Sequence, residues 1–348
     1  MRILLLLSFV LFTAPALADS PSDQQTPAIT YCTRPADCPQ GLVFSSGDWL
    51  LACNNLGDCA AVGYHPGRTG HTGHPPVSVL IHRLAGAGKP AQTLLKVEPP
   101  APENMQMNGQ PIRPGLLLSL VRSQPDRPIT ISGGGKTWTL STRGAAEVLA
   151  KMDAFQGHSG TATALLHPGQ RHYRIDAPVT RPTIRRPLPP VGQPRTSDSE
   201  ALRRLLRDSL AASGLAPYGC QRLDHSNHPG QPVPLFTLYP LDQNIVLAEV
   251  YCSYGNGSRL FAAVSSDLQR LIAWAPVSND TDAEYAHGRI RARHSEGEFG
   301  ECYRQLEYVW TDRGFDVSGL GISGLCGKGS MSYTWDTLPL FETNVVFD

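Results

Sequence analysis

The sequence predicts an α+β fold that is rich in β structure, with two antiparallel-sheet domains, each carrying one packed helix, stapled by disulfides. Short runs of Val, Ile, Leu and Thr are bounded by Gly, Pro or Asn, as in antiparallel sheets. Two segments have apolar residues at helical spacing, one in each half of the chain. Eight cysteines follow an apparent export signal, and thiols pair in oxidising compartments.

The amino terminus has the pattern of a secretory signal peptide. Arg2 precedes an uninterrupted apolar run, and small residues at Ala16 and Ala18 form a cleavage site. Cleavage there removes residues 1–18 and leaves residues 19–40 as an amino-terminal segment of the mature chain. No later segment reaches the ~20 apolar residues that a membrane span requires. We therefore expect a periplasmic or secreted protein with no integral membrane segment after signal cleavage.

Residues 41–176 are expected to form the amino-terminal β-rich domain. Apolar residues recur at helical spacing from Thr142 until Gly157, and this helix should pack its apolar stripe on the sheet. The glycines in ISGGGKTWTL indicate a hairpin. Strands are expected at 76–84, 92–99, 116–121, 128–132 and 137–142.

Residues 177–197 are rich in proline and have no apolar periodicity. Proline favours the extended polyproline II conformation, so this segment is predicted to be a semi-rigid linker between two domains.

Residues 198–348 are expected to form an antiparallel meander covered by a helix near its amino end. Ser197 and Glu200 have the spacing of a capping box, and the helix should end at Gly214. Its apolar face consists of Leu202, Leu205, Leu206 and Leu210. Strands are expected at 235–239, 244–253, 259–266, 270–277, 301–310 and 315–322, with Asn256-Gly257 and Asp312-Arg313-Gly314 as hairpin turns.

The cysteines are interpreted as structural cross-links. In DWLLACNNLGDCAAVGYHP, an antiparallel hairpin places Cys53 opposite Cys59, at a separation that suits a disulfide. A Cys-x5-Cys spacing without a partner pair fits a zinc site poorly, and the Cys-x2-Cys of redox proteins is absent. Folding 301–310 onto the strand after it also brings Cys302 near Cys326. The remaining pairs are then Cys220 with Cys252 and Cys32 with Cys38.

Candidate metal ligands are few. His65, His71 and His74 lie in one loop, and imidazole is a common ligand of zinc and copper. The loop is rich in Gly and Pro and has no nearby carboxylate, so we interpret it as a solvated loop and predict no metal site.

Two stretches resemble catalytic motifs, but neither has the sequence context that the motif requires. Ser159 in GHSGT follows a helix, whereas a nucleophile elbow leads into one. GGGKT lacks the first glycine of a phosphate-binding loop, because Thr130 stands there. We therefore name no catalytic residue and no cofactor. An acidic pair drawn from Asp48, Glu249, Glu298 and Glu301 stays open as an alternative.

The tryptophans fall mostly on expected strands, where burial is their ordinary state. A carbohydrate platform is the alternative for some of them, which are Trp49, Trp138, Trp274, Trp310 and Trp335.

The cysteine hairpin and several later motifs resemble a family of exported bacterial proteins, domain of unknown function 1176. The similar stretches are DWLLACNNLGDCAAVGYHP, MDAFQGHSGT, LDQNIVLAEVYCSYGNG, GEFGECYRQLEYVWTDRGF and GLCGKGSMSYTW. Asn54 stands where the family pattern has Asp, and Glu301 also departs from it. The family has no established activity, so the resemblance implies export and architecture only.

The composition excludes a broad basic surface for nucleic acid, since Lys plus Arg and Asp plus Glu are equal at 30 each. The leading hypothesis is a non-catalytic module that binds an envelope ligand or protein. Two alternatives stay open: an exported hydrolase acting on cell-wall or glycan material, and a secreted enzyme inhibitor.

Overall fold

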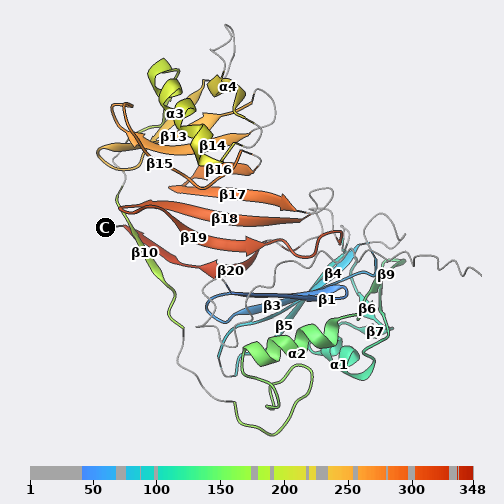
Figure 1. Cartoon of the computed structure of the whole chain (residues 1–348). Helices are drawn as coiled ribbons and strands as arrows, with labels where there is room; N and C mark the ends of the chain where they lie inside the picture. Colours follow the sequence, from blue (N-terminus) through green and yellow to red (C-terminus); the bar gives the residue numbers. More distant parts are fainter. Residues whose placement is uncertain are drawn as a thin grey trace, which may run out of the picture. The chain divides into compact units, whose positions relative to one another are not determined.

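The computed structural model describes most of the chain beyond residue 40. The described residues are 41–67, 76–86, 88–97, 101–173, 179–188, 192–216, 219–224, 234–253, 258–279, 281–296, 302–328, 335 and 337–347. They fall within one compact unit, Cys32–Asp348. Strands dominate, in three five-stranded sheets, a four-stranded sheet and a two-stranded pair (Figure 1). The domain boundaries expected from the sequence stay a prediction.

The first sheet is an antiparallel meander in sequence order. Every residue of its second and third strands is buried, because apolar groups cover both faces. On one face Leu51 and Ala61 belong to one core cluster, and on the other Leu50 and Val62 pack with Trp335. The strands are β1 (Leu42–Ser46), β2 (Trp49–Cys53), β3 (Cys59–Tyr64), β4 (Val77–Arg83) and β5 (Gln92–Val97).

A smaller sheet, in the order β7-β6-β8-β9, and two helices follow. Its strands are β6 (Gln106–Met107), β7 (Gln110–Pro111), β8 (Ile129–Gly133) and β9 (Lys136–Leu140), and the helices are α1 (Leu116–Ser123) and α2 (Ala145–Phe155). Helix α2 packs on β1, β2 and β3 with Val148, Leu149 and Met152 buried (Figure 1). This helix and the β8–β9 hairpin confirm the sequence expectation.

One expected strand is wrong, because residues 116–121 lie in helix α1. Leu116, Leu117, Leu120 and Val121 are buried, and their spacing places them on one side of a helix. A short apolar run between turn residues suits a buried strand or a buried helix, so periodicity alone does not separate the two. The amino-terminal part therefore has two helices rather than one.

The carboxyl-terminal part contains two antiparallel meanders. The first consists of β11 (Arg195–Ser197), β12 (Phe236–Pro240), β13 (Ile245–Tyr251), β14 (Arg259–Ser265) and β15 (Leu271–Trp274). The second consists of β16 (Asp282–Ala286), β17 (Arg289–Glu296), β18 (Cys302–Thr311), β19 (Gly314–Ile322) and β20 (Leu338–Glu342). Phe261 of the first meander and Trp310 of the second share a core cluster. The β18–β19 hairpin confirms the expected turn at Asp312 and Arg313.

Helices α3 (Glu200–Ser213) and α4 (Gln221–Asp224) complete this part, which again has two helices where one was expected. The capping box is wrong: Ser199 caps α3 by accepting a hydrogen bond from Leu202 N at 3.2 Å. Glu200 is instead paired with Arg203, so it does not return to the cap. Gly214, with φ of 69°, ends the helix as expected. In the described part of the chain, no helix is long and apolar enough to cross a membrane.

The proline-rich segment is partly paired rather than only a spacer. Strand β10 (Thr183–Arg186) pairs in parallel with β21 (Asn344–Phe347), near the end of the chain. Arg186 is buried, and its guanidinium donates to the carbonyl oxygen of Gly288 at 2.6 Å. Prolines around β10 keep it short but do not prevent its pairing.

Candidate functional site

Three disulfides form within the described residues. They join Cys53 to Cys59, Cys220 to Cys252, and Cys302 to Cys326, which are pairs that the sequence predicts. Cys53 and Cys59 lie directly opposite each other on β2 and β3, with Cα atoms 4.0 Å apart. Cys32 and Cys38 lie outside the described residues. The six described cysteines are all cross-linked, so none of them offers a free thiol as a nucleophile or a metal ligand.

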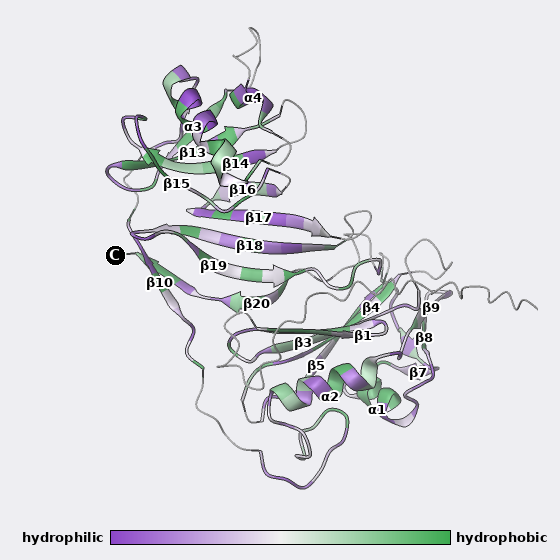
Figure 2. Cartoon of the chain, in the orientation of Figure 1, coloured by the Kyte–Doolittle hydropathy of each residue, from purple (hydrophilic) through white to green (hydrophobic). Residues whose placement is uncertain are grey.

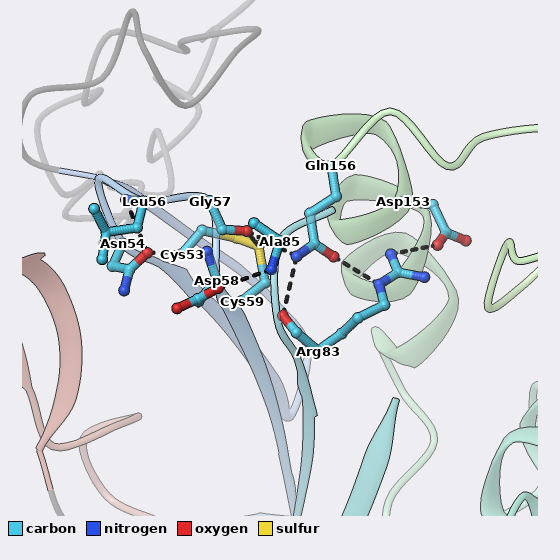
Figure 3. Close-up of a disulfide and its surroundings, with 10 residues drawn as sticks. All are labelled: Cys53, Asn54, Leu56, Gly57, Asp58, Cys59, Arg83, Ala85, Asp153 and Gln156. Atoms are coloured by element: carbon cyan, nitrogen blue, oxygen red, sulfur yellow. Dashed lines mark hydrogen bonds and ion pairs between the residues drawn. A yellow bond between two sulfur atoms is a disulfide. The ribbon is translucent and has the colours of Figure 1, made fainter. Parts of the chain in front are cut away.

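The Cys53–Cys59 disulfide lies near a buried polar network (Figure 3). Arg83 is fully buried, and its guanidinium donates to Gln156 Oε1 at 2.7 Å and to Asp153 Oδ1 at 2.8 Å. Gln156 donates through Nε2 to the carbonyl oxygen of Gly57, in the disulfide loop, at 2.7 Å. A buried guanidinium is costly unless its charge and donors are matched. We interpret this network as the structural link between β4, α2 and the disulfide loop.

The loop after α2 holds His158 and Ser159. His158 is fully buried; its Nδ1 lies 2.7 Å from Thr163 Oγ1, and its ring stacks on Tyr173 with centroids 4.3 Å apart. Burial, and then the positive charge of Arg83, lower the pKa of His158 to about 4. Ser159 is exposed and follows α2 instead of leading into a helix, so the nucleophile-elbow context is absent.

Of the three candidate metal ligands, only His65 lies in the described part of the chain. His65 is buried; Nδ1 is 3.1 Å from the carbonyl oxygen of Pro66, and Nε2 is 2.9 Å from that of Lys328. His71 and His74 lie outside the described residues. Among the described residues, no three His, Cys, Asp or Glu side chains are grouped as metal ligands. His65 instead joins β3 to the segment after the last disulfide.

Asp48, between β1 and β2, is the centre of a buried charge cluster. Its carboxylate accepts hydrogen bonds from Ser141 Oγ at 2.6 Å, from the Arg143 guanidinium at 3.1 Å and from the Lys328 ammonium. Lys328 also donates to the carbonyl oxygen of Gly67 at 2.5 Å. Burial alone would raise the pKa of Asp48, but hydrogen bonds from Lys328, Ser141 and Arg143 outweigh burial and lower it. Asp48 is therefore a charged group with a structural role.

Glu249, on β13, is held in a separate cluster. It accepts a hydrogen bond from Tyr239 Oη at 2.9 Å and forms a salt bridge with Arg259 at 3.2 Å. Burial, and then the charge of Glu249, raise the pKa of Tyr239. Asp48 and Glu249 thus lie in separate polar clusters with different partners. Glu298 and Glu301 lie outside the described residues.

The tryptophans do not form an exposed aromatic platform. Four of them are buried, and these are Trp49, Trp138, Trp310 and Trp335. Trp274 is partly buried, and its Nε1 donates to Ser209 Oγ at 3.2 Å. The alternative of a tryptophan platform for carbohydrate is therefore wrong.

A cavity of about 190 Å³ opens instead on the β16–β20 sheet. Its floor is the part of β19 from Ser318 to Gly321. The strands on one side contribute Arg289, Gln305 and Glu307, and the segment around β20 contributes Thr337, Pro339, Phe341, Glu342 and Thr343. Strands β17 and β18 are mainly hydrophilic (Figure 2), as expected for strands with one face outside the core. A second cavity, of about 370 Å³ beside Leu210 and Cys220, borders chain positions outside the described ranges.

Two β-bulges and two glycines build the floor of the first cavity. Val317 pairs with Tyr308 and Gly319 pairs with Glu307, so Ser318 is the extra residue of one bulge. A second irregularity, where β19 meets β20, follows Leu320. Gly319 and Gly321 are two residues apart and share a face, which leaves that face without side chains between β18 and β20. Bulges are frequent next to functional sites, and a glycine within a strand often marks a close approach.

Charged groups of the cavity are paired in place. Glu307 contacts the guanidinium of Arg289 at 3.0 Å and that of Arg291 at 3.2 Å. Glu342 accepts a hydrogen bond from Asn54 Nδ2 at 2.5 Å and lies 3.6 Å from the Arg181 guanidinium. Ser318 is buried, and its Oγ has no hydrogen-bond partner among the described residues.

The chain matches the family described as "Protein of unknown function (DUF1176)" over residues 43–341. It belongs to this family. The DUF1176 match confirms the resemblance that the cysteine hairpin and the later motifs indicate. It also includes the cavity residues from Arg289 to Phe341, whereas Glu342 and Thr343 follow its last residue. Neither the curated proteins nor the solved structures give a match.

Sequence reasoning missed the cavity of this DUF1176 protein. The signal that could have found it is Gly319-Leu320-Gly321 within an expected strand, since glycine weakens a strand unless its small size is used. The charged lining has no local pattern, because strand pairing brings Arg289, Glu307 and Glu342 together.

Proposed function

We propose that this chain is an exported periplasmic protein that binds a small ligand of the bacterial envelope without transforming it. The observation that carries the proposal is the cavity on the β16–β20 sheet, which has a glycine floor, several hydrogen-bonding groups and charges that are already paired. A concave site with a few convergent polar groups is the usual form of a small-molecule site. The signal-like amino terminus and the disulfides support export.

A hydrolase acting on glycan material is the second candidate function. The observation that favours it is the presence of two carboxylates, Glu307 and Glu342, in the lining of one cavity. The two residues lie on either side of the same position of β19, because Gly319 pairs with both Glu307 and Glu342. Glycoside hydrolases use two carboxyl groups that flank the bond they cleave. Both carboxylates here contact guanidinium groups, which suits holding a ligand more than donating a proton.

The test uses the purified mature chain and a soluble digest of peptidoglycan. We expect a subset of fragments to be retained with the protein on ultrafiltration and their masses to be unchanged after prolonged incubation. Heat-unfolded protein serves as the control. New fragment masses that appear only with native protein, and disappear with Glu307→Gln, would favour the hydrolase. Absence of both retention and turnover would overturn the proposed binding function.

A further inference from the structure

Each charged residue that lines the cavity is in a salt bridge, which constrains the ligand. Three guanidinium groups face three carboxylates, and the salt bridges are Arg289–Glu307, Arg291–Glu307, Arg291–Glu284 and Arg181–Glu342. The lining itself contains one of these guanidinium groups, Arg289, and two of these carboxylates, Glu307 and Glu342, while Arg293 next to the lining donates to Gln305 Oε1 at 2.9 Å. A charged ligand would have to displace one of these partners and leave a partly buried charge unmatched, which costs free energy. A neutral ligand meets no such cost.

The lining offers many hydrogen-bonding groups at short intervals. Gln305, Glu307 and Arg289 have planar ends that can contact two neighbouring hydroxyl groups at once. Thr337 adds a hydroxyl from the other side of the floor. Such a lining suits a ligand with several adjacent hydroxyl groups.

The two sides of the floor differ in polarity. Strand β18 contributes only polar side chains, Gln305 and Glu307, whereas β20 contributes the apolar Pro339 and Phe341 together with Glu342. A sugar ring also has polar edges and an apolar face, and aromatic side chains pack against such faces. The volume of about 190 Å³ is below the roughly 300–1,000 Å³ of clefts for drug-sized ligands, so the cavity has room for one ring rather than a chain.

From this geometry we infer that the cavity binds a single neutral sugar unit, held by hydrogen bonds from Arg289, Gln305 and Glu307 and packed against Phe341. This inference rests on the proposed binding function and adds the chemical class of the ligand. The position of Gly319 must carry no side chain, because a side chain there would occupy the space of the sugar ring.

Gly319→Ala is a suitable test variant. A Cβ at Gly319 would lie 3.5 Å from Glu307 Oε2, an ordinary contact, and Gly319 has no positive φ. The substitution should therefore preserve folding and fill only the cavity. Gly192→Ala is the matched control, since its Cβ would lie 3.6 Å from Pro240 Cγ, away from the cavity. Gly321 cannot serve, because a Cβ there would overlap Thr337 and the Leu338 carbonyl oxygen.

The experiment titrates the mature chain with four probes by saturation-transfer NMR: N-acetylglucosamine, glucosamine, alanyl-alanine and glycerol phosphate. We expect the neutral sugar to bind at least tenfold more tightly than the cationic, zwitterionic and anionic probes. Gly319→Ala should weaken its binding by roughly tenfold or more, whereas Gly192→Ala should not change it. Unchanged thermal unfolding of both variants excludes loss of folding.

Other outcomes separate the two proposals. If the peptidoglycan digest is retained but a charged probe binds better than the neutral sugar, the ligand class is wrong and the binding function stands. If the neutral sugar binds equally well to Gly319→Ala, the assigned cavity is wrong. If neither the digest nor any probe binds, both proposals fail.

Discussion

The surroundings of His158 oppose a positive charge on its imidazole. It has no exposed surface, stacks on Tyr173, and lies near both Arg83 and Asp153. Burial is the larger cause of its lowered pKa, the charge of Arg83 the second, and Asp153 acts in the opposite direction. The neutral imidazole is therefore part of the folded structure.

This pKa predicts a loss of stability in mild acid. An unfolded histidine titrates near 6.5, so between pH 6.5 and about 4 the unfolded chain binds a proton that the folded chain does not. The stabilisation is complete above pH 6.5 and declines as the pH falls toward 4, by about 2 to 3 kcal/mol. Urea unfolding at pH 7 and pH 4.5 measures the decline.

His158→Asn should remove most of this pH dependence, since asparagine does not titrate. His287→Asn is the matched control, because His287 is exposed and its positive φ of 51° suits asparagine. The control should keep the pH dependence of the parent chain. An equal decline in both variants would show that His158 is not its source.

At the scale of elements, two helices begin at glycines in the left-handed region. Gly115 precedes α1 with φ of 78°, and Gly144 precedes α2 with φ of 89°. The two glycines differ in the space that is available for a Cβ atom. A Cβ at Gly115 would meet no atom within 4 Å, whereas a Cβ at Gly144 would overlap the carbonyl oxygen of Ser46. Gly144 thus allows α2 to approach the turn after β1.

The pair of glycines gives a prediction about helix placement. Gly115→Ala should cost about 1 to 2 kcal/mol, the price of the left-handed conformation alone. Gly144→Ala should cost about 3 kcal/mol or more, because backbone must also move. Urea unfolding of both variants measures the difference. Equal losses in the free energy of unfolding would mean that the backbone at Ser46 moves away from the added Cβ without further cost.

Most elements were predictable where a local pattern decides them. The apolar stripes of α2 and α3 and the turns of the β8–β9 and β18–β19 hairpins are such patterns. Each is formed by residues that are close together in the sequence. Helix α1 was not predictable, because a run such as LLLSLV has the same composition as a buried strand. The cap of α3 was misplaced because Ser197 and Ser199 are both good caps, and Ser197 Oγ instead accepts from Ser199 N at 3.2 Å.

At the scale of the whole molecule, the buried ion pair between Asp48 and Lys328 joins residues that are 280 apart in sequence. Both side chains are almost completely buried, at 2% and 9% exposure. The disulfides, in contrast, span only 6, 24 and 32 residues. Cysteine spacing therefore predicted the pairs within each part. No sequence pattern could indicate the buried ion pair or the charged lining of the cavity, since both depend on how distant segments pack.

Lys328→Met should destabilise the chain by about 3 to 5 kcal/mol, because it leaves Asp48 buried without its ammonium partner. Arg143→Met should cost no more than about 1 kcal/mol, since the Arg143 side chain is 73% exposed. Urea unfolding at pH 7 measures both. In an Asp48→Asn background the cost of Lys328→Met should fall sharply, and a cost that stays the same would assign it to packing instead of charge.

The separation of Asp48 from Lys328 also has a consequence for biosynthesis. Ribosomes make Asp48 280 residues before Lys328, so the β2–β3 hairpin can close its disulfide long before the Asp48 carboxylate meets the ammonium group. A product that terminates before Lys328 keeps both cysteines of this hairpin but lacks the ammonium partner of Asp48. Whether translation has passed Lys328 thus decides whether the carboxylate next to this hairpin finds its partner.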